Sequence, residues 1–399
     1  MVEKKLFDLA KLIKFRKHMH NNPELAFEEV NTSKNIISYL KDLGIEDSQI
    51  RVVAKTGLVV DIKGKGAPSG KPYTVAFRAD MDCLPMKELN DVEYKSNRDD
   101  RAHMCGHDGH CTWMLGATSK LMEVITQIPS DKVARLLFQP AEESPGGAFP
   151  MIQEGCLDGV DEVYGAHNLP VQRTGKLLVK SGPVMSQVTI ILINIIGKGG
   201  HGSAPEKAKD PLQAAVDIHL GYRELLKNYD EHIKKKTLVS TMPFLQCGEA
   251  PNVIHERAVL KGTIRSFDET LTLKFKAEFQ AMCEQVCRKH GVKLDMQLNT
   301  LYPATVNTPK ETQIVKDVAK EIYGEDNVSE ENLPLMASED FSFFTRYVPG
   351  VFFFPTSGRL NENNPYLHEP NFNFDDEAIE KASELFYKLA LHRFDVKLQ

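Results

Sequence analysis

The stretch HMCGHDGH, residues 103–110, brings together side chains that could do several kinds of chemistry. Three histidines, one cysteine and one aspartate lie within it, alongside two glycines. Such a cysteine could form a disulfide, ligate a structural zinc ion, act as a nucleophile or ligate a catalytic metal. The remainder of the sequence has to decide among these four roles.

The distribution of cysteines argues against the first two roles. The 399 residues contain seven scattered cysteines, an odd number, and the amino terminus lacks the apolar core of a secretory signal. Reduced thiols and a cytoplasmic location are therefore expected. A structural zinc site commonly uses two Cys-x-x-Cys pairs, and the sequence contains none. Cys105 is thus expected to be a metal ligand or a nucleophile.

Other side chains of metal-binding type follow short apolar runs that predict strands. The run YTVAFRA leads into two aspartates, VARLLFQ into a Glu–Glu pair, and EVYGA into a histidine. Ligands bind beyond the carboxyl ends of the strands in open α/β sheets, so we expect these side chains to converge. The late segment YLHEPNFNF supplies one more histidine. The expected cluster comprises Asp80, Asp82, Cys105, His107, Glu142, Glu143, His167 and His368.

The chemistry of this cluster suits a divalent metal. Imidazole, thiolate and carboxylate together bind ions such as zinc and manganese. One member of the Glu142–Glu143 pair could bind metal while the other takes a proton from a water molecule. The positive end of the helix that follows Cys105 is expected to favour its thiolate. Each residue alone has a more ordinary explanation as a core or surface side chain, so the prediction depends on their coincidence at strand ends.

Alternating strands and helices predict the scaffold that positions this cluster. Residues 110–126 have helical periodicity and lie between strand-like apolar runs, as in an α/β sheet covered on both faces. After about residue 185 the order becomes strand, helix, strand, strand, helix, strand, which is that of a ferredoxin-like α+β unit. The predicted organisation is a catalytic domain, residues 1–184 and 300–399, with a smaller domain, residues 185–299, inserted into it.

The composition argues against two classes of partner. The chain is 42% hydrophobic and 26% charged, which is typical of globular proteins, and its formal net charge is −6. A negative chain without a long basic run is not expected to bind nucleic acid. No apolar run approaches the length of a membrane span, so no membrane partner is expected either.

A series of motifs spans nearly the whole chain. In order they are RKHMHNNPELAFEE (16–29), FRADMDCLPMKE (77–88), HMCGHDGH, FQPAEESPGGA (138–148), GAHNLP (165–170), GKGGHGSAPE (197–206), PNVIHE (251–256), GTIRSF (262–267), MASEDFSFF (336–344) and LHEPNFNFDDE (367–377). In these motifs the chain resembles the metal-dependent amidohydrolases that include hippurate hydrolases, indole-acetyl-amino-acid hydrolases and N-acetyl-diaminopimelate deacetylases, relatives of the aminoacylases. Departures from the common pattern at Cys111, His255 and Ala337 avoid the expected ligands.

The resemblance implies a binuclear-metallopeptidase-like catalytic domain with a mixed sheet and two divalent ions, Zn²⁺ or Mn²⁺. Cys105 would bridge the two ions. His107 and His167 would complete one site, and Glu143 and His368 would complete the other.

The same resemblance assigns roles to the remaining carboxylates. Glu142 would be the general base and acid. Asp80 would orient a metal ligand from behind, and Asp82, two residues later, is an alternative for that role.

The resemblance further implies that the inserted domain is a lid and a dimerisation unit, and hence a homodimer. His201, in GGHGSAP, would stabilise an oxyanion in its own or a partner subunit's site. Asn252 and Arg265 match substrate-binding positions, and a guanidinium suits a bidentate grip on a carboxylate. Taken alone, a Gly-rich turn and ordinary strand positions would explain these residues.

The implied function is hydrolysis of the amide bond of N-acyl amino acids, such as N-acetyl or N-benzoyl conjugates, to a carboxylic acid and a free amino acid. A dipeptidase or carboxypeptidase on the same scaffold is one alternative. A non-catalytic, metal-stabilised binding protein is another, although such a protein needs no general base. A thiol-nucleophile hydrolase using Cys105 would be inhibited by alkylation and indifferent to chelators.

Overall fold

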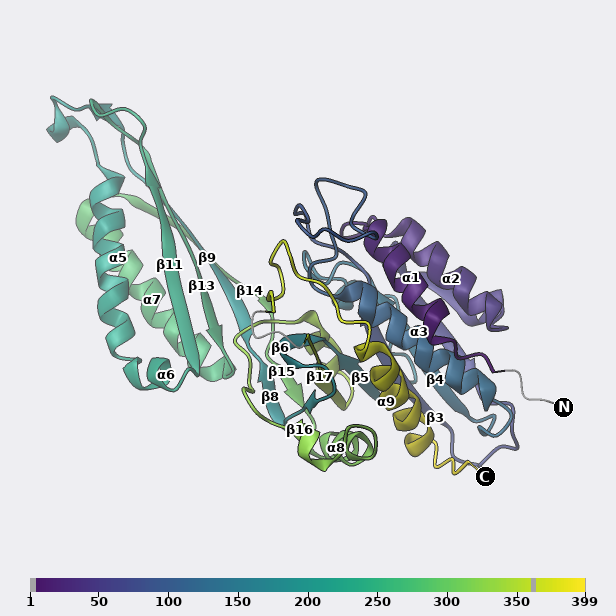
Figure 1. The fold of residues 1–399 in the computed structure, drawn as a ribbon. Coiled ribbons are helices and arrows are strands. Elements are labelled where there is room, and N and C mark those ends of the chain that lie inside the picture. Colours follow the sequence, from purple (N-terminus) through teal and green to yellow (C-terminus); the bar gives the residue numbers. More distant parts are fainter. Residues whose placement is uncertain (1–4, 360–363, 399) are drawn as a thin grey trace. The chain divides into compact units, whose positions relative to one another are not determined.

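The computed structural model describes residues 5–359 and 364–398, which divide into two compact units. The larger unit comprises residues 1–184, 306–333 and 340–399, and the inserted unit comprises residues 185–305 and 334–339. Figure 1 colours the chain along its sequence, and the teal and green middle portion forms the inserted unit. Strands β8 (Gly182–Met185) and β15 (Thr305–Asn307) contain two of the boundaries between the units.

A mixed nine-stranded sheet organises the larger unit, in the order β1-β2-β4-β3-β5-β17-β7-β16, with β6 pairing with β17. Strand β3 runs parallel to both β4 and β5, so the carboxyl ends of these three strands lie at one edge. Strands β1 and β2 add antiparallel pairs on one side. The strands are β1 (Ile50–Val53), β2 (Gly57–Lys63), β3 (Tyr73–Asp80), β4 (Lys132–Gln139), β5 (Glu162–Ala166), β6 (Leu169–Arg173), β7 (Leu177–Leu178), β16 (Val328–Ser329) and β17 (Gly350–Gly358).

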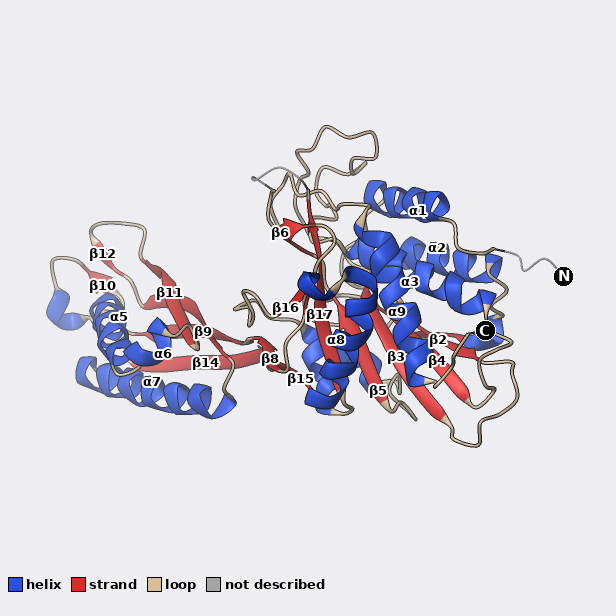
Figure 2. Cartoon of the chain, turned by 60° about the horizontal axis from the view of Figure 1, so that its bottom comes forward, coloured by secondary structure: helices blue, strands red, loops and turns tan. Residues whose placement is uncertain are grey.

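Helices cover both faces of this sheet, as the sequence predicted (Figure 2). Successive side chains of β17 point to opposite faces. Phe353 packs on Phe386 of α9, with ring centroids 5.3 Å apart, and Phe352 packs on Phe341 of the 3₁₀ segment η4 at 4.9 Å. The helical elements are α1 (Leu9–Asn21), α2 (Val30–Asp42), α3 (His107–Glu123), α4 (Ala148–Gln153), α8 (Pro309–Tyr323), α9 (Ala378–Arg393), η1 (Asp47–Gln49), η3 (Glu325–Asn327) and η4 (Asp340–Arg346).

Helix α3 is the element that carries the sequence stretch of interest. It begins at His107, three residues before the start that its apolar periodicity predicted, because its first turn is polar yet fully buried. Gly106 precedes it in the left-handed region with φ 102°. A Cβ at Gly106 would lie 2.1 Å from Oδ1 of Asn168, so only glycine allows this approach between the helix start and the segment after β5.

The inserted unit is a four-stranded antiparallel sheet in the order β11-β13-β9-β14, with α5 and α7 on one face (Figure 1). Ile191, Ile193 and Ile195 of β9 alternate into its core. The order of the main elements is the predicted ferredoxin-like one, with a short two-stranded ribbon, β10 with β12, added. The elements are β9 (Gln187–Ile196), β10 (Gly200–His201), η2 (Pro205–Lys207), α5 (Pro211–Lys227), α6 (Asp230–Lys234), β11 (Leu238–Cys247), β12 (Val253–Ile254), β13 (Arg257–Ser266), α7 (Glu269–His290) and β14 (Lys293–Tyr302).

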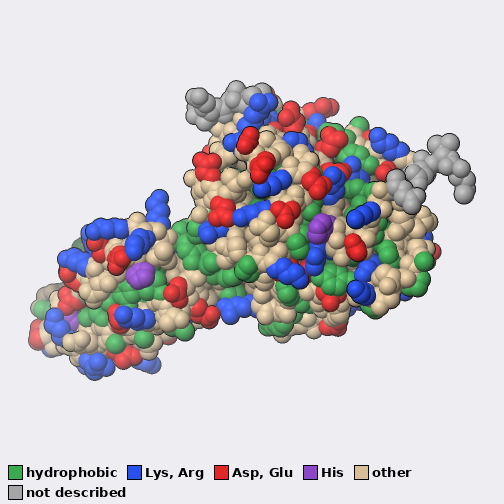
Figure 3. Space-filling model, turned by 90° about the horizontal axis from the view of Figure 1, so that it is seen from below, with side chains coloured by type: hydrophobic (Ala, Val, Ile, Leu, Met, Phe, Trp, Pro, Cys, Tyr) green, Lys and Arg blue, Asp and Glu red, His purple; other side chains and the backbone are tan. Residues whose placement is uncertain are grey.

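The surface carries charges of both signs. On the face drawn in Figure 3, acidic and basic side chains are interspersed. Among the described residues, no helix combines the length and apolar character that crossing a membrane requires.

Candidate metal centre

Side chains from four separate segments meet at the carboxyl edge of the larger unit's sheet. The Cys105 Sγ atom lies 3.3 Å from Nε2 of His167 and 3.3 Å from Nε2 of His368. Nε2 of His368 is in turn 3.0 Å from Oε1 of Glu143. The ligand atoms of Cys105, His107 and His167 lie within 4.8 Å of one another, and so do those of Cys105, Glu143 and His368. Cys105 belongs to both triplets, which is the arrangement of a ligand shared by two ions.

The hydrogen bonds of two histidines leave the correct ring nitrogen available for metal. Nδ1 of His107 donates to the carbonyl of Asp82 at 2.9 Å, and Nδ1 of His167 donates to the carbonyl of Asn168 at 2.7 Å. Each ring therefore directs its other nitrogen, Nε2, toward the cluster. Nε2 of His107 is buried without a hydrogen-bond partner in the described part of the chain. A buried nitrogen of this kind needs a partner, so the side chains present fit a divalent cation.

Asp82 contacts both sides of the cluster. Its two carboxylate oxygens accept the backbone N–H groups of Glu142 at 3.0 Å and of Glu143 at 3.1 Å. Oδ1 also lies 3.4 Å from Nδ1 of His107. The turn that precedes Glu142 includes Ala141 in the left-handed region, with φ 54°, a conformation that surrounding contacts have to hold. Asp82 is well placed to fix the Glu142–Glu143 turn relative to His107.

Asp80 reaches the cluster mainly through another histidine. Its carboxylate pairs with Arg78 at 2.7 Å and lies 2.5 Å from Nδ1 of His110. The backbone N–H of Asn168 donates to Nε2 of His110 at 3.0 Å. Asp80 and His110 are thereby connected to Asn168, the residue that follows His167. The sequence prediction missed His110 and Asn168. A signal for His110 existed, because it follows His107 by three residues and so lies on the same helix face.

The electrostatics of Cys105 contradict one sequence-based expectation. Burial, followed by the charges of Glu143 and Glu142, raises the pKa of the Cys105 thiol well above its usual value. The prediction that the helix start favours the thiolate is therefore wrong for the protein without metal, because burial and neighbouring carboxylates outweigh the helix dipole.

Carboxylates beside His107 favour positive charge on its ring. Burial lowers the pKa of His107, but the charges of Asp80 and Asp82 outweigh this and raise that pKa to about 10. Burial likewise opposes ionisation of Glu143, yet the hydrogen bond from His368 and the charge of His107 lower its pKa. The site contains several buried carboxylates, and a bound cation would compensate their negative charge.

The remaining predicted site residues lie in the inserted unit. His201 is exposed on β10, with Nδ1 2.7 Å from the hydroxyl oxygen of Ser203. Asn252 is exposed directly before β12, the strand that pairs with β10, so His201 and Asn252 share one ribbon. Arg265, half-buried on β13, donates to the carbonyl of Met336 at 3.0 Å and to the Ser338 hydroxyl at 3.1 Å.

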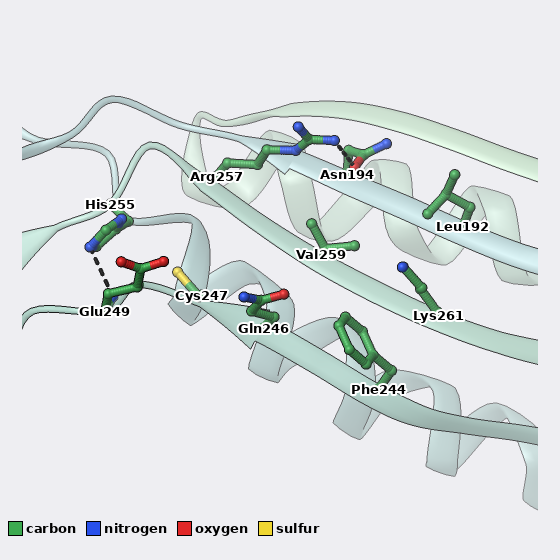
Figure 4. Close-up of a pocket in the computed structure, with 11 residues that line it drawn as sticks. Leu192, Asn194, Phe244, Gln246, Cys247, Glu249, His255, Arg257, Val259 and Lys261 are labelled. Atoms are coloured by element: carbon green, nitrogen blue, oxygen red, sulfur yellow. Dashed lines mark hydrogen bonds between the residues drawn. The ribbon is translucent and has the colours of Figure 1, made fainter. Parts of the chain in front are cut away.

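A groove of about 510 Å³ lies on the sheet face of the inserted unit (Figure 4). Arg257 donates to Asn194 at 2.5 Å along one wall, and Lys261 lies 4.8 Å from the ring centroid of Phe244 on another. None of the candidate ligand triplets found among the described residues lies in this groove. The chemistry is therefore assigned to the larger unit.

Comparison with known proteins identifies the family of the chain. The sequence profile described as Peptidase family M20/M25/M40 matches residues 76–392. The chain belongs to this family. It is 35% identical over 381 residues to the hippurate hydrolase of Campylobacter jejuni, covering 95% of each chain.

Two further comparisons cover almost the whole chain. It is 34% identical over 392 residues to thermostable carboxypeptidase 2 of Saccharolobus solfataricus, covering 97% of this chain and 96% of that one. Among solved structures, it is similar to the Bacillus subtilis YXEP protein, a dinuclear metal-binding peptidase of the M20 family, with a TM-score of 0.80 and 28% identity over 98% of this chain and 99% of that one.

Proposed function

We propose that this M20 enzyme is a metal-dependent amidohydrolase that cleaves N-acyl amino acids to a carboxylic acid and a free amino acid. The observation that carries the proposal is the position of Cys105 in two ligand triplets, one with His107 and His167 and the other with Glu143 and His368. These residues would hold two divalent ions. The donor set of sulfur, nitrogen and oxygen suits both Zn²⁺ and Mn²⁺.

The residues of the chain divide the work of amide hydrolysis. When bound, the ions polarise the substrate carbonyl and lower the pKa of water. Glu142 takes the proton from the attacking water and delivers it to the leaving amine nitrogen. Its place beside Glu143 and His107, with carboxylate and ring atoms within 4.8 Å, supports this role. Asp82 holds the Glu142–Glu143 turn, and Asp80 orients His110. His201 stabilises the oxyanion.

Arg265 supports a substrate with a carboxylate. Burial lowers the pKa of its guanidinium, and it has no carboxylate partner among the described residues. A half-buried cation bonded only to a carbonyl and a hydroxyl gains most from an anionic ligand. We assign it the carboxylate of the amino-acid portion, with Asn252 as a further substrate contact.

A carboxypeptidase activity is the second candidate. It is favoured by the similarity to thermostable carboxypeptidase 2, and a substrate carboxylate at Arg265 is common to both activities. A panel of N-acetyl and N-benzoyl amino acids beside free and N-blocked dipeptides distinguishes them by kcat/KM.

The deciding experiment combines metal analysis with one substitution. Protein purified without chelator should contain about two divalent ions per chain, and activity should vanish on stripping and return with Zn²⁺ or Mn²⁺. Glu142→Gln should keep both ions while kcat falls at least about 100-fold, because only the proton acceptor is lost. Near-normal turnover in this variant, or activity that survives complete stripping, refutes the mechanism.

We further assign the inserted unit as a lid and a homodimer interface. Leu212, Val216 and Leu220 form a stripe along α5 at four-residue spacing and are 40%, 43% and 56% exposed. Light scattering of the wild type and of a Val216→Glu variant tests this assignment, since a dimer should dissociate in the variant. All seven cysteines are free, which supports a cytoplasmic location.

A further inference from the structure

A buried ionic clasp lies directly behind the candidate metal centre, and the mechanism above does not use it. The clasp consists of His20 in α1, Glu88 in the loop before α3, and Asp108 in the first turn of α3. Nδ1 of His20 lies 2.9 Å from Oδ2 of Asp108, and Nε2 lies 3.2 Å from Oε1 of Glu88. All three side chains are at most 1% exposed.

His20 donates from both ring nitrogens in this arrangement. Burial lowers its pKa, but the hydrogen bonds to Asp108 and Glu88 outweigh burial and raise it. The charged ring thus ties two carboxylates together in a site that excludes water, where such bonds are strong. Arg16, one turn earlier in α1, adds a second bond to Asp108 at 3.1 Å.

One arm of the clasp leads to the segment that carries His368. The residue after Glu88, Leu89, donates its backbone N–H to the carbonyl of Pro370 at 2.7 Å. The side chain of Asn90 donates both to Glu88 at 3.0 Å and to the carbonyl of Phe372 at 2.7 Å. His368 itself has φ 67°, a conformation that has to be held by its surroundings.

The other arm of the clasp, through Asp108, leads to the CGHD segment, residues 105–108. Asp108 follows His107 directly and lies three residues after Cys105, in the turn that begins α3. The two arms also meet near the centre, because the N–H of His368 donates to the carbonyl of Met104 at 2.8 Å. Through its contacts with Asp108 and Glu88, His20 therefore connects helix α1 to both backbone segments that supply candidate ligands.

We propose that His20 is a positioning residue that holds the His368 segment and the CGHD segment in register, so that Cys105 and His368 can bind the same ion. This inference depends on the ligand set proposed above. Outer groups that orient metal ligands typically contribute about 10- to 100-fold in metal affinity. A purely structural clasp would contribute to the stability of the fold and leave metal affinity unchanged.

Two substitutions of His20 test its contact with Asp108 and its contact with Glu88 separately. Asn places its amide nitrogen near the Nδ1 position of histidine and Gln places its own near Nε2, so His20→Asn keeps a donor for Asp108 and His20→Gln keeps one for Glu88. Metal-free protein is titrated with Co²⁺, and the thiolate-to-cobalt absorption band and chelator competition report each binding step. His18→Asn is the matched control, because His18 lies in the same helix and is exposed. Among the described residues its ring bonds only the side chains of Asn22 and Asn35.

We expect His20→Asn to weaken one of two Co²⁺ steps at least about 10-fold while the other changes less than about 3-fold. His18→Asn should match the wild type, and His20→Gln should retain more of the affected step than His20→Asn. Wild-type affinity for both ions in both His20 variants, with only a lower melting temperature, overturns the inference. If His20→Asn does not fold, Glu88→Gln tests the same arm, and unchanged affinity there is equally decisive. A wild type that binds no ion refutes the proposed function instead.

Discussion

Asp82→Asn is the substitution that tests the local architecture of the site most directly. Asp82 accepts two backbone N–H groups, from Glu142 at 3.0 Å and from Glu143 at 3.1 Å. Asparagine has the same shape but only one accepting oxygen. Its amide nitrogen would face one of the two N–H donors, so one donor loses its partner and the other loses the charge of its acceptor.

The expected cost follows from these contacts. Leaving one buried donor without an acceptor costs about 1–3 kcal/mol. Because Glu143 is a proposed ligand and Asp82 also approaches His107 at 3.4 Å, most of this cost should appear as metal affinity. A loss of about 1.4 kcal/mol is tenfold in an equilibrium constant, so metal binding should weaken about 10- to 100-fold.

Chelator competition measures this loss on purified protein, and kcat at saturating metal measures how far Glu142 is displaced. Asp161→Asn is the matched control, since Asp161 is exposed and accepts the backbone N–H of Thr74 at 2.8 Å away from the site. Asp80→Asn should instead lower the stability of the fold more strongly, because Asp80 pairs with buried Arg78. Wild-type metal affinity and kcat in Asp82→Asn would show that Asp82 does not position the Glu142–Glu143 turn.

Two further predictions concern substrate and pH. Arg265→Ala should raise KM for N-benzoylglycine while kcat changes little, and an unchanged KM removes Arg265 from the substrate site. Burial lowers the pKa of His103 to about 4, and its ring nitrogens have no hydrogen-bond partner among the described residues. Protonation of the His103 ring is unfavourable in the folded state. The stabilisation from the neutral ring is therefore complete above the ordinary histidine pKa of about 6.5, and the free energy of unfolding falls by about 3 kcal/mol as the pH decreases toward 4. In urea unfolding of the metal-free proteins, the free energy of unfolding of His103→Asn should fall less between pH 7 and pH 4 than that of the wild type. An identical fall in the two proteins would show that His103 is not the source of this pH dependence.

The long periodic elements were predictable because their signals are local. The apolar face of α7 and the nearly continuous apolar run of β9 identify these elements within a single window of sequence. The short strands β6, β7 and β16 were not predicted, since each exists only through pairing with a segment far along the chain. The start of α3 was missed for a related reason. His107 and Asp108 are buried because distant partners bind them, which hydrophobic periodicity does not represent.

The candidate site divides in the same way. The candidate ligands have recognisable residue types, and Glu143 and His167 follow strands, so the sequence could group them. The groups of the clasp could not be found, because His20, Glu88 and Asp108 lie in three segments that only the folded chain brings together. The question of Asp80 or Asp82 also required coordinates, since Asp80 ends β3, Asp82 follows two residues later, and only their contacts differ.

The charges around Cys105 distinguish a ligand from a nucleophile. A thiol nucleophile needs a lowered pKa, but burial and the charges of Glu143, Glu142 and Asp80 raise the pKa of Cys105. His167 and His368 lie at 3.3 Å, yet they direct Nε2 atoms toward the sulfur, and the pKa of His167 is well below its usual value because of burial and the charge of His110. A divalent ion would reverse the effect of these carboxylates, because the negative charges that oppose a bare thiolate stabilise a cation beside it. The arrangement that makes Cys105 a poor nucleophile is therefore the one that suits it to bind a metal.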